Sequence, residues 1–204
     1  MKQGILLLAA VLACIASPSA IAQKDVSAMT NTEIAKQSTD PMSNLWLVIT
    51  EFSTSFTPGS SYNKTNQSTI DIQPVMPVSL TRSWRVLNFP ELVLASQGSA
   101  SGSQINGVQN FSWLGAFSPA WNQMGFCWGV GPYISFPVSS NLELAPSQWQ
   151  VGGGAAASYQ TTNAIAVGVL KGAWATSNNR EVAGNAQFQY NIQRFFGDGY
   201  QVGL

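Results

Sequence analysis

The chain has 204 residues, of which 45% are hydrophobic and only 9% are charged. Nine basic and nine acidic residues leave no net charge, so the basic excess of a nucleic-acid-binding protein is missing. The absence of histidine excludes Ser-His-Asp triads and most metal sites, and seven Trp and ten Phe argue against disorder. Soluble domains carry about 25% charged residues, so this composition favours a protein with much of its surface in lipid.

The N-terminus has the pattern of a secretory signal peptide. Lys2 precedes an apolar run from Ile5 to Ala16, and the small residues of Ala20-Ile21-Ala22 follow. This pattern predicts a signal peptide over residues 1–22, cleaved between Ala22 and Gln23. The run is too short for a transmembrane helix, which needs about 20 apolar residues.

A second interpretation treats Val11-Leu12-Ala13-Cys14 as a lipoprotein signal in which Cys14 is acylated. Under the first interpretation Cys127 is the one cysteine left after cleavage. A single cysteine forms no internal disulfide, so this exported chain has no disulfide framework.

Residues 23–41 form a polar N-terminal segment with a short helical pattern around Thr32 to Lys36. Thr30 or Asn31 is suited to cap this helix, and Asp40-Pro41 ends it because the residue before proline avoids helical geometry. We expect a loosely held periplasmic segment in front of the first strand, placed to enter a lumen.

Residues 42–204 alternate between strand patterns and turn residues. From Asn185 to Gln193, polar amides alternate with Ala, Phe, Tyr and Ile, which predicts a strand with one amide face and one apolar face. We expect Phe188, Tyr190 and Ile192 to face outward. The other predicted strands cover residues 44–56, 68–79, 84–95, 108–118, 125–137, 148–160 and 164–175.

The connections between these strands alternate between long and short, as in outer-membrane barrels with short periplasmic turns. The predicted fold is therefore all-β, a transmembrane antiparallel up-and-down β-barrel. Trp residues near strand ends fit the aromatic girdles of such barrels. Prolines at 74, 77, 90 and 132 require bulges or positions near a rim, because proline cannot donate to the strand ladder.

After the eighth strand, Gly197-Asp198-Gly199 predicts a hairpin, and a ninth strand starts at Tyr200. An unpaired edge inside a bilayer costs several kcal/mol for each exposed backbone group. We therefore expect the sequence to be a fragment: a barrel incomplete at the C-terminus, with about eight strands plus a stub, whose first and last strands do not pair.

Three stretches carry a family resemblance: Glu33 to Trp46, Ile70 to Leu80 followed by Trp84, and Leu114 to Val138. Together they resemble the bacterial outer-membrane transporters of the "meta-pathway of phenol degradation" family. That family is itself similar to barrels that carry hydrophobic compounds, including the long-chain fatty-acid transporters. The resemblance covers about Glu33 to Leu204. It implies fold and location, and gives no binding residues.

No catalytic constellation, metal site or cofactor is predicted. The lumen-facing candidates are polar residues on the polar faces of their strands, where a charge avoids the cost of facing lipid: Glu51, Asp71, Glu91, Gln187, Gln189 and Asn191. The acidic trio is interpreted either as a patch that orients solute or holds the N-terminal segment, or as solvated lumen filler. Gly152-Gly153-Gly154 lacks the context of a phosphate loop and is expected to let the wall bend or a plug approach.

The predicted function is an outer-membrane, porin-like transporter that passes small hydrophobic or aromatic solutes without chemistry. Its expected partners are outer-membrane lipid and the solute, and no nucleic acid. The alternative is an exported soluble or lipid-anchored all-β binding protein. An outer-membrane phospholipase is disfavoured, because it would require histidine.

Overall fold

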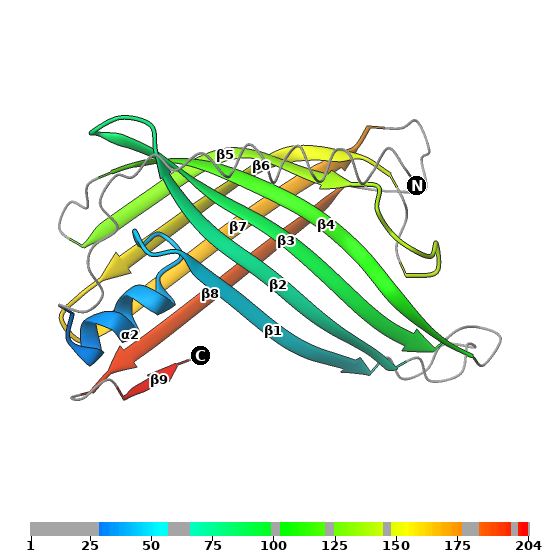
Figure 1. Ribbon diagram of the computed structural model, residues 1–204, viewed down its shortest axis with the longest axis horizontal. Coiled ribbons are helices and arrows are strands. Elements are labelled where there is room, and N and C mark those ends of the chain that lie inside the picture. Colours follow the sequence, from blue (N-terminus) through cyan, green and yellow to red (C-terminus); the bar gives the residue numbers. More distant parts are fainter. Residues whose placement is uncertain are drawn as a thin grey trace.

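The computed structural model describes residues 29–56, 66–98, 103–120, 125–144, 148–176, 184–196 and 200–203. These ranges contain one helix and nine strands in a single antiparallel sheet, which curves into an open half-barrel (Figure 1). The elements are α2 (Asn31–Thr39), β1 (Leu47–Phe56), β2 (Asn66–Ser79), β3 (Trp84–Gly98), β4 (Gln104–Pro119), β5 (Phe126–Phe136), β6 (Gln150–Gln160), β7 (Ala164–Ala175), β8 (Asn185–Phe195) and β9 (Gln201–Gly203).

The strands follow one another in the sheet in sequence order, and each pairs with the next. All eight predicted strands are present, with β7 at its predicted bounds and β4 starting four residues earlier than expected. Among the described strands, β1 and the short β9 have no partner on their outer edges. The predicted all-β, up-and-down antiparallel sheet, open because its first and last strands do not pair, is therefore confirmed.

Three of the four strand prolines are accommodated by gaps in the ladder. The pairs Ile72–Leu92 and Met76–Asn88 place Pro74 opposite Pro90, and no paired residues occur between them. Two prolines supply no N–H donor to each other, so the ladder opens at this point. Pro132 faces Gly115 in a similar gap between β4 and β5.

The expectation that these prolines need bulges or rim positions is wrong for Pro74, Pro90 and Pro132, whereas Pro77 lies near the rim, two residues before the end of β2. The register shift between β3 and β4 falls at Val93/Leu94, away from any proline. Pro77 lies opposite Leu87 within a continuous register. The sheet tolerates its prolines by losing individual hydrogen bonds while keeping the register.

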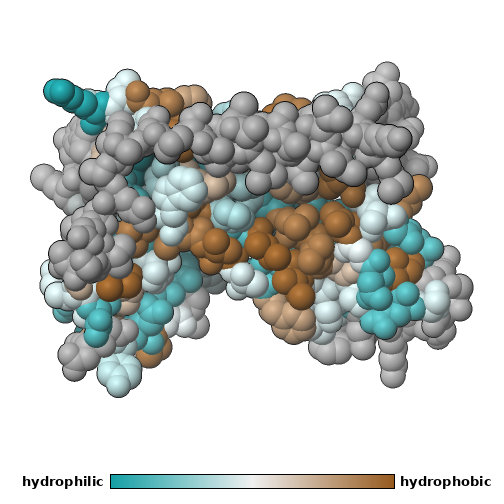
Figure 2. Space-filling view, viewed as in Figure 1, coloured by the Kyte–Doolittle hydropathy of each residue, from teal (hydrophilic) through white to brown (hydrophobic). Residues whose placement is uncertain are grey.

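The two faces of the sheet differ in curvature and in burial. Lys171 on β7 contacts Glu91 on β3, four strands away, so these side chains point into the concave side. The same face holds an apolar cluster, which includes Leu87, Leu114 and Tyr133. In the view of Figure 2, apolar residues gather in the middle of the molecule and polar residues lie toward both ends.

Helix α2 confirms the predicted helix and its cap. The Thr30 hydroxyl accepts a hydrogen bond from the Glu33 N–H at 3.2 Å, and the helix ends before Asp40. The helix lies at the end of the sheet that carries the short turns (Figure 1).

The expectation that residues 23–41 are loosely held is wrong at Met29 and Asp40, which are buried, whereas helix α2 between them has no buried residue. Met29, Asp40, Met42 and Leu45 are buried, because the chain from 29 to 45 packs against the concave face of the sheet. We call residues 29–45 the plug. The predicted signal peptide, residues 1–22, lies outside the described residues.

Candidate functional site

A buried ion pair lies on the concave face between two distant strands. Glu91 Oε2 accepts hydrogen bonds from Lys171 Nζ and from the Ser112 hydroxyl, both at 2.9 Å. The two charged side chains are only 4% and 11% exposed. A buried pair of this kind is sensitive to the loss of one member, because the remaining charge is left without compensation.

The other two predicted acids lie next to each other. Glu51 on β1 is directly opposite Asp71 on β2, and the register puts both on the concave face with Glu91. Asp71 Oδ1 has no hydrogen-bond partner. The three predicted acids therefore fall into two groups. Glu91 is neutralised by Lys171, whereas Glu51 and Asp71 lie next to each other near the β1 edge of the sheet.

The three predicted amides lie on the concave side of β8. Gln187 is opposite Lys171, Gln189 is opposite Val169, and Asn191 is opposite Val167. The alternate residues Phe188, Tyr190 and Ile192 are exposed on the convex side. The six predicted candidates therefore share one face.

Lys171 links the acidic and amide groups, and it was missing from the predicted set. Its signal was available in the alternation of β7. Lys171 shares a face with Val167 and Val169, opposite to Leu170 and Trp174. The sequence did not by itself select this single charge in an apolar strand as a site residue, because its partner Glu91 lies 80 residues away.

Arg85 on β3 attaches the plug to the wall. Its Nη2 donates to the Met42 carbonyl at 2.6 Å, and its Nη1 donates to the Ser43 carbonyl at 3.3 Å and to Asn44 Oδ1. Nη2 also lies 3.1 Å from the sulfur of Cys127. One buried guanidinium thus satisfies several consecutive groups of the plug.

Asp40 makes a second attachment, to β6. Its Oδ1 accepts from the Met42 N–H at 2.8 Å, and its Oδ2 accepts from the Ser158 hydroxyl at 3.1 Å. Burial raises the pKa of the Asp40 carboxyl, while those two hydrogen bonds and the charge of Arg85 oppose the rise in pKa.

The helical part of the plug contacts the short-turn end of the sheet. Lys36 Nζ donates to the backbone carbonyls of Thr161 and Thr162, and the Thr39 hydroxyl lies 3.1 Å from Gln193 Oε1. A cavity of about 160 Å³ remains between plug and wall, lined in part by Gln37 and Gln160. The plug is therefore attached to this end of the sheet by hydrogen bonds and leaves a small polar space beside the wall.

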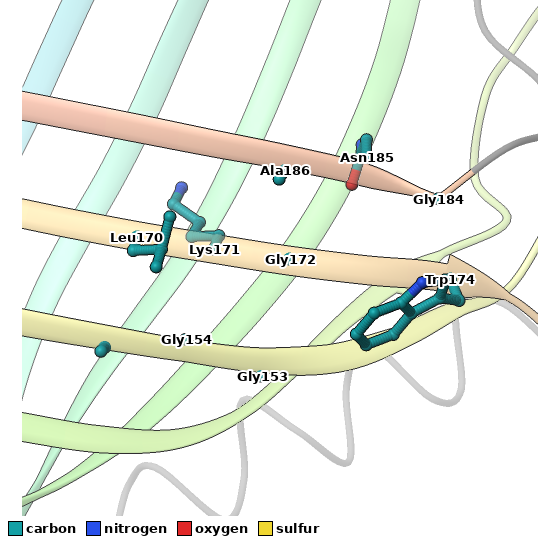
Figure 3. Close-up of a pocket in the computed structure, with 10 residues that line it drawn as sticks. Gly153, Gly154, Leu170, Lys171, Gly172, Trp174, Gly184, Asn185 and Ala186 are labelled. Carbon is teal, nitrogen blue, oxygen red and sulfur yellow. The ribbon is translucent and has the colours of Figure 1, made fainter.

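A shallow recess of about 430 Å³ lies across β6, β7 and β8 (Figure 3). Leu170 and Trp174 stand on either side of Gly172, with Gly153 and Ala186 on the neighbouring strands. Leu170 and Trp174 are exposed, whereas Lys171 between them points to the concave side. The recess is thus an apolar hollow in the convex wall.

No protein-family model matches this chain, and comparisons with curated proteins and with solved structures give no significant match. The resemblance to the outer-membrane transporters therefore stays a prediction. In the part of the chain that the structure describes, no helix has both the length and the apolar character required to cross a bilayer.

Proposed function

We propose that this chain forms the wall of an outer-membrane β-barrel that passes small hydrophobic or aromatic solutes without chemistry. The observation that carries the proposal is the convex face. Large apolar side chains such as Phe52, Val130 and Phe188 are exposed there, while the charged pair Glu91–Lys171 is on the concave face. A soluble protein seldom exposes apolar area on this scale, and lipid is the natural partner for it.

The spacing of aromatic residues supports a position in a bilayer. On the convex side of β6, Trp149 precedes the strand at one end and Tyr159 lies at the other, ten residues apart. At about 3.4 Å per residue this is roughly 34 Å of strand. A tilt near 40° converts that length to about 26 Å of depth, which agrees with the apolar band of roughly 25 Å between aromatic girdles in outer-membrane barrels.

An amide in the middle of the convex band has its hydrogen bonds satisfied within the protein, as a lipid environment requires. Asn88 donates to the Met76 carbonyl at 3.2 Å and accepts from Trp113 Nε1 at 3.3 Å. Trp113 lies in the middle of its strand and is therefore not a girdle residue. Its indole N–H instead satisfies the side-chain oxygen of Asn88. Satisfied amides of this kind support a wall that faces hydrocarbon.

The lining of the concave side favours passage of a hydrophobic solute over passage of a hydrated one. The concave face carries the apolar cluster of Leu87, Phe89, Leu114 and Tyr133, and Met42 of the plug packs on it. A wide aqueous pore would have a polar lining. An apolar interior narrowed by a plug favours small apolar molecules.

Membrane insertion is tested by carbonate washing of outer membranes from a Gram-negative host that expresses the full chain. We expect the protein to stay in the membrane fraction and to show a heat-dependent gel mobility. Release by carbonate would contradict the proposal and support the exported soluble alternative.

Solute passage is tested in the same cells, because their lipopolysaccharide leaflet excludes hydrophobic molecules. We expect faster uptake of the fluorescent probe N-phenylnaphthylamine than in cells without the protein, and no change for a polar dye of similar size. Equal gains for both dyes would indicate a leaky membrane and would argue against selective passage.

A further inference from the structure

Arg194 differs from the other charged residues of the strands by its position on the convex face. The charged side chains of the described strands otherwise point to the concave side: Glu51, Asp71, Arg85, Glu91 and Lys171. Arg194 is opposite Ala164, on the face of Phe188 and Tyr190. If that face meets lipid, Arg194 is the one strand charge on the lipid side in the described part of the chain.

The position of Arg194 corresponds to the edge of the apolar band. Its partner Ala164 starts β7, and Trp174 lies ten residues further along the same face of β7. That distance equals the spacing from Trp149 to Tyr159, about 26 Å of depth at the tilt used above. Arg194 therefore lies at the level of lipid headgroups when Trp174 lies at the opposite interface.

Arg194 shares a pocket with a second cation from the plug. The pocket measures about 420 Å³ and opens at the short-turn rim, between α2 and the end of β8. Lys36 and Arg194 line it together with the polar side chains of Thr32 and Asn163, and no acidic residue does. Two positive charges without a carboxylate leave this rim pocket complementary to an anion.

The cations are held in place without being neutralised. Lys36 Nζ is fixed by the carbonyls of the turn at 161–162, and it lies 5.8 Å from the ring centre of Phe195. The Arg194 guanidinium stands over the ring of Phe196 at 5.7 Å, and its N–H groups have no hydrogen-bond partner within the described residues. An exposed Phe196 beside free guanidinium donors suits a molecule with an apolar and an anionic part.

We propose that the rim pocket binds the phosphate headgroup of an anionic phospholipid, with Arg194 as the main contact and Lys36 as the second. This inference rests on the proposed membrane location. The phosphate group would accept from the guanidinium while the acyl chains lie along the apolar convex face. Polar headgroup oxygens would reach Thr32 and Asn163.

The test uses the full chain reconstituted into phosphatidylcholine bilayers with spin-labelled phosphatidylglycerol or spin-labelled phosphatidylcholine as the probe. Electron spin resonance gives the relative association constant of the two lipids. Because one basic group near the headgroups changes association by about fivefold, we expect phosphatidylglycerol to be preferred severalfold. Arg194→Gln should reduce this preference by about fivefold, and Arg194→Lys should keep most of it.

Arg82 provides the matched control, since it is an exposed arginine in the turn at the same end of the sheet and lies outside the pocket. Arg82→Gln should reduce the preference much less than Arg194→Gln, because Arg82 has no second cation beside it in a pocket. Equal loss in R82Q and R194Q would overturn the specific site, as would the absence of any preference in the wild type.

The same experiment distinguishes a lipid from a free anion. Displacement of the labelled lipid by soluble glycerol phosphate would identify a free-anion site and would overturn the proposal of a lipid ligand. Failure to remain in bilayers after carbonate washing would instead refute the membrane proposal.

Discussion

At the scale of single residues, buried charges on the concave face are satisfied by groups that lie far away in the sequence. Lys171 neutralises Glu91 across the half-barrel, and Arg85 binds the carbonyls of the plug. Each contact crosses between elements that are not neighbours in the sheet. These residues therefore connect regions that strand pairing alone leaves apart.

Lys171→Met should destabilise the folded protein by about 3–5 kcal/mol, because Glu91 would remain buried without a cation. The measurement is the free energy of unfolding from urea titrations followed by tryptophan fluorescence. Glu143→Gln, at an exposed loop carboxyl, is the control and should change that free energy by less than about 0.5 kcal/mol. In the double variant K171M/E91L the loss should be largely recovered; a K171M effect as small as that of E143Q would refute the importance of the pair.

Asp40 should give the unfolding free energy a specific pH dependence. Because burial raises the pKa of Asp40 above 3.8, the folded protein keeps a proton that the unfolded chain has already released. The stability that this group contributes is fully present below pH 3.8 and is lost as the pH rises through the raised pKa. Urea titrations at a series of pH values measure this contribution as the difference between wild type and Asp40→Asn.

We expect the wild type to lose stability relative to D40N as the pH increases above 3.8, and the difference to become constant once Asp40 is ionised in the folded state. Asn retains an acceptor for the Met42 N–H or the Ser158 hydroxyl, so the variant should still fold. A difference that is independent of pH would show that Asp40 has an ordinary pKa.

At the scale of elements, glycines in β6 determine how closely neighbouring chain segments approach. A Cβ on Gly152 would lie 1.8 Å from the Gly172 carbonyl oxygen, and one on Gly154 would lie 2.7 Å from the Leu114 side chain. A Cβ on Gly153 would meet only the Gly131 oxygen, at 3.7 Å. Within one run of three glycines, Gly152 is required by close contact with backbone, Gly154 has a tight contact with a movable side chain, and Gly153 has room.

Gly152→Ala and Gly153→Ala form a matched pair of adjacent substitutions. G152A should lower the free energy of unfolding by about 3 kcal/mol or more, the upper end of the cost of an overpacked core. The cost is high because a backbone carbonyl must move to make room for the added methyl group. G153A should be neutral or stabilise by about 0.4–1 kcal/mol through the unfolded chain. The fraction of heat-modifiable folded protein on gels and the urea midpoint measure both; similar losses in the two variants would contradict the role of the Gly172 contact.

At the scale of the whole molecule, the chain forms a curved wall whose convex side is apolar and whose concave side holds the charges and the plug. Strand β8 shows this division clearly. Its Tyr190, opposite Gly168, lies on the convex side, and its Gln189, opposite Val169, lies on the concave side. If the convex side meets lipid, the two positions must differ in their access to water.

Single cysteines at 189 and 190 test this orientation in intact outer membranes. Under the proposed membrane location, we expect a water-soluble maleimide to label Gln189→Cys on the concave face and not Tyr190→Cys on the convex face. The unaltered chain serves as the control, because its described cysteine, Cys127, is buried and should not react. Labelling at 190 without labelling at 189, through a channel known to be open, would reverse the assigned faces.

Much of this architecture could be predicted from local patterns. The alternation in β8, the Thr30 cap and the Asp40-Pro41 stop all act within a few residues, so the strand positions, the helix and the face of each candidate residue followed from the sequence. A ninth strand was likewise predicted to start at Tyr200, and the structure contains a short strand there as β9.

Contacts between distant segments were decided only by the tertiary structure. The sequence indicates that Glu91 lies on a polar face, but only the curvature of the sheet brings Lys171 within 2.9 Å of it. Residues 23–41 were expected to be loosely held because they are polar, and only the structure shows that Asp40 is attached to Ser158 and the following Met42 to Arg85, on strands far along the chain. Side-chain alternation is a local property of the backbone, and closure of the sheet around the plug depends on how all the strands twist together.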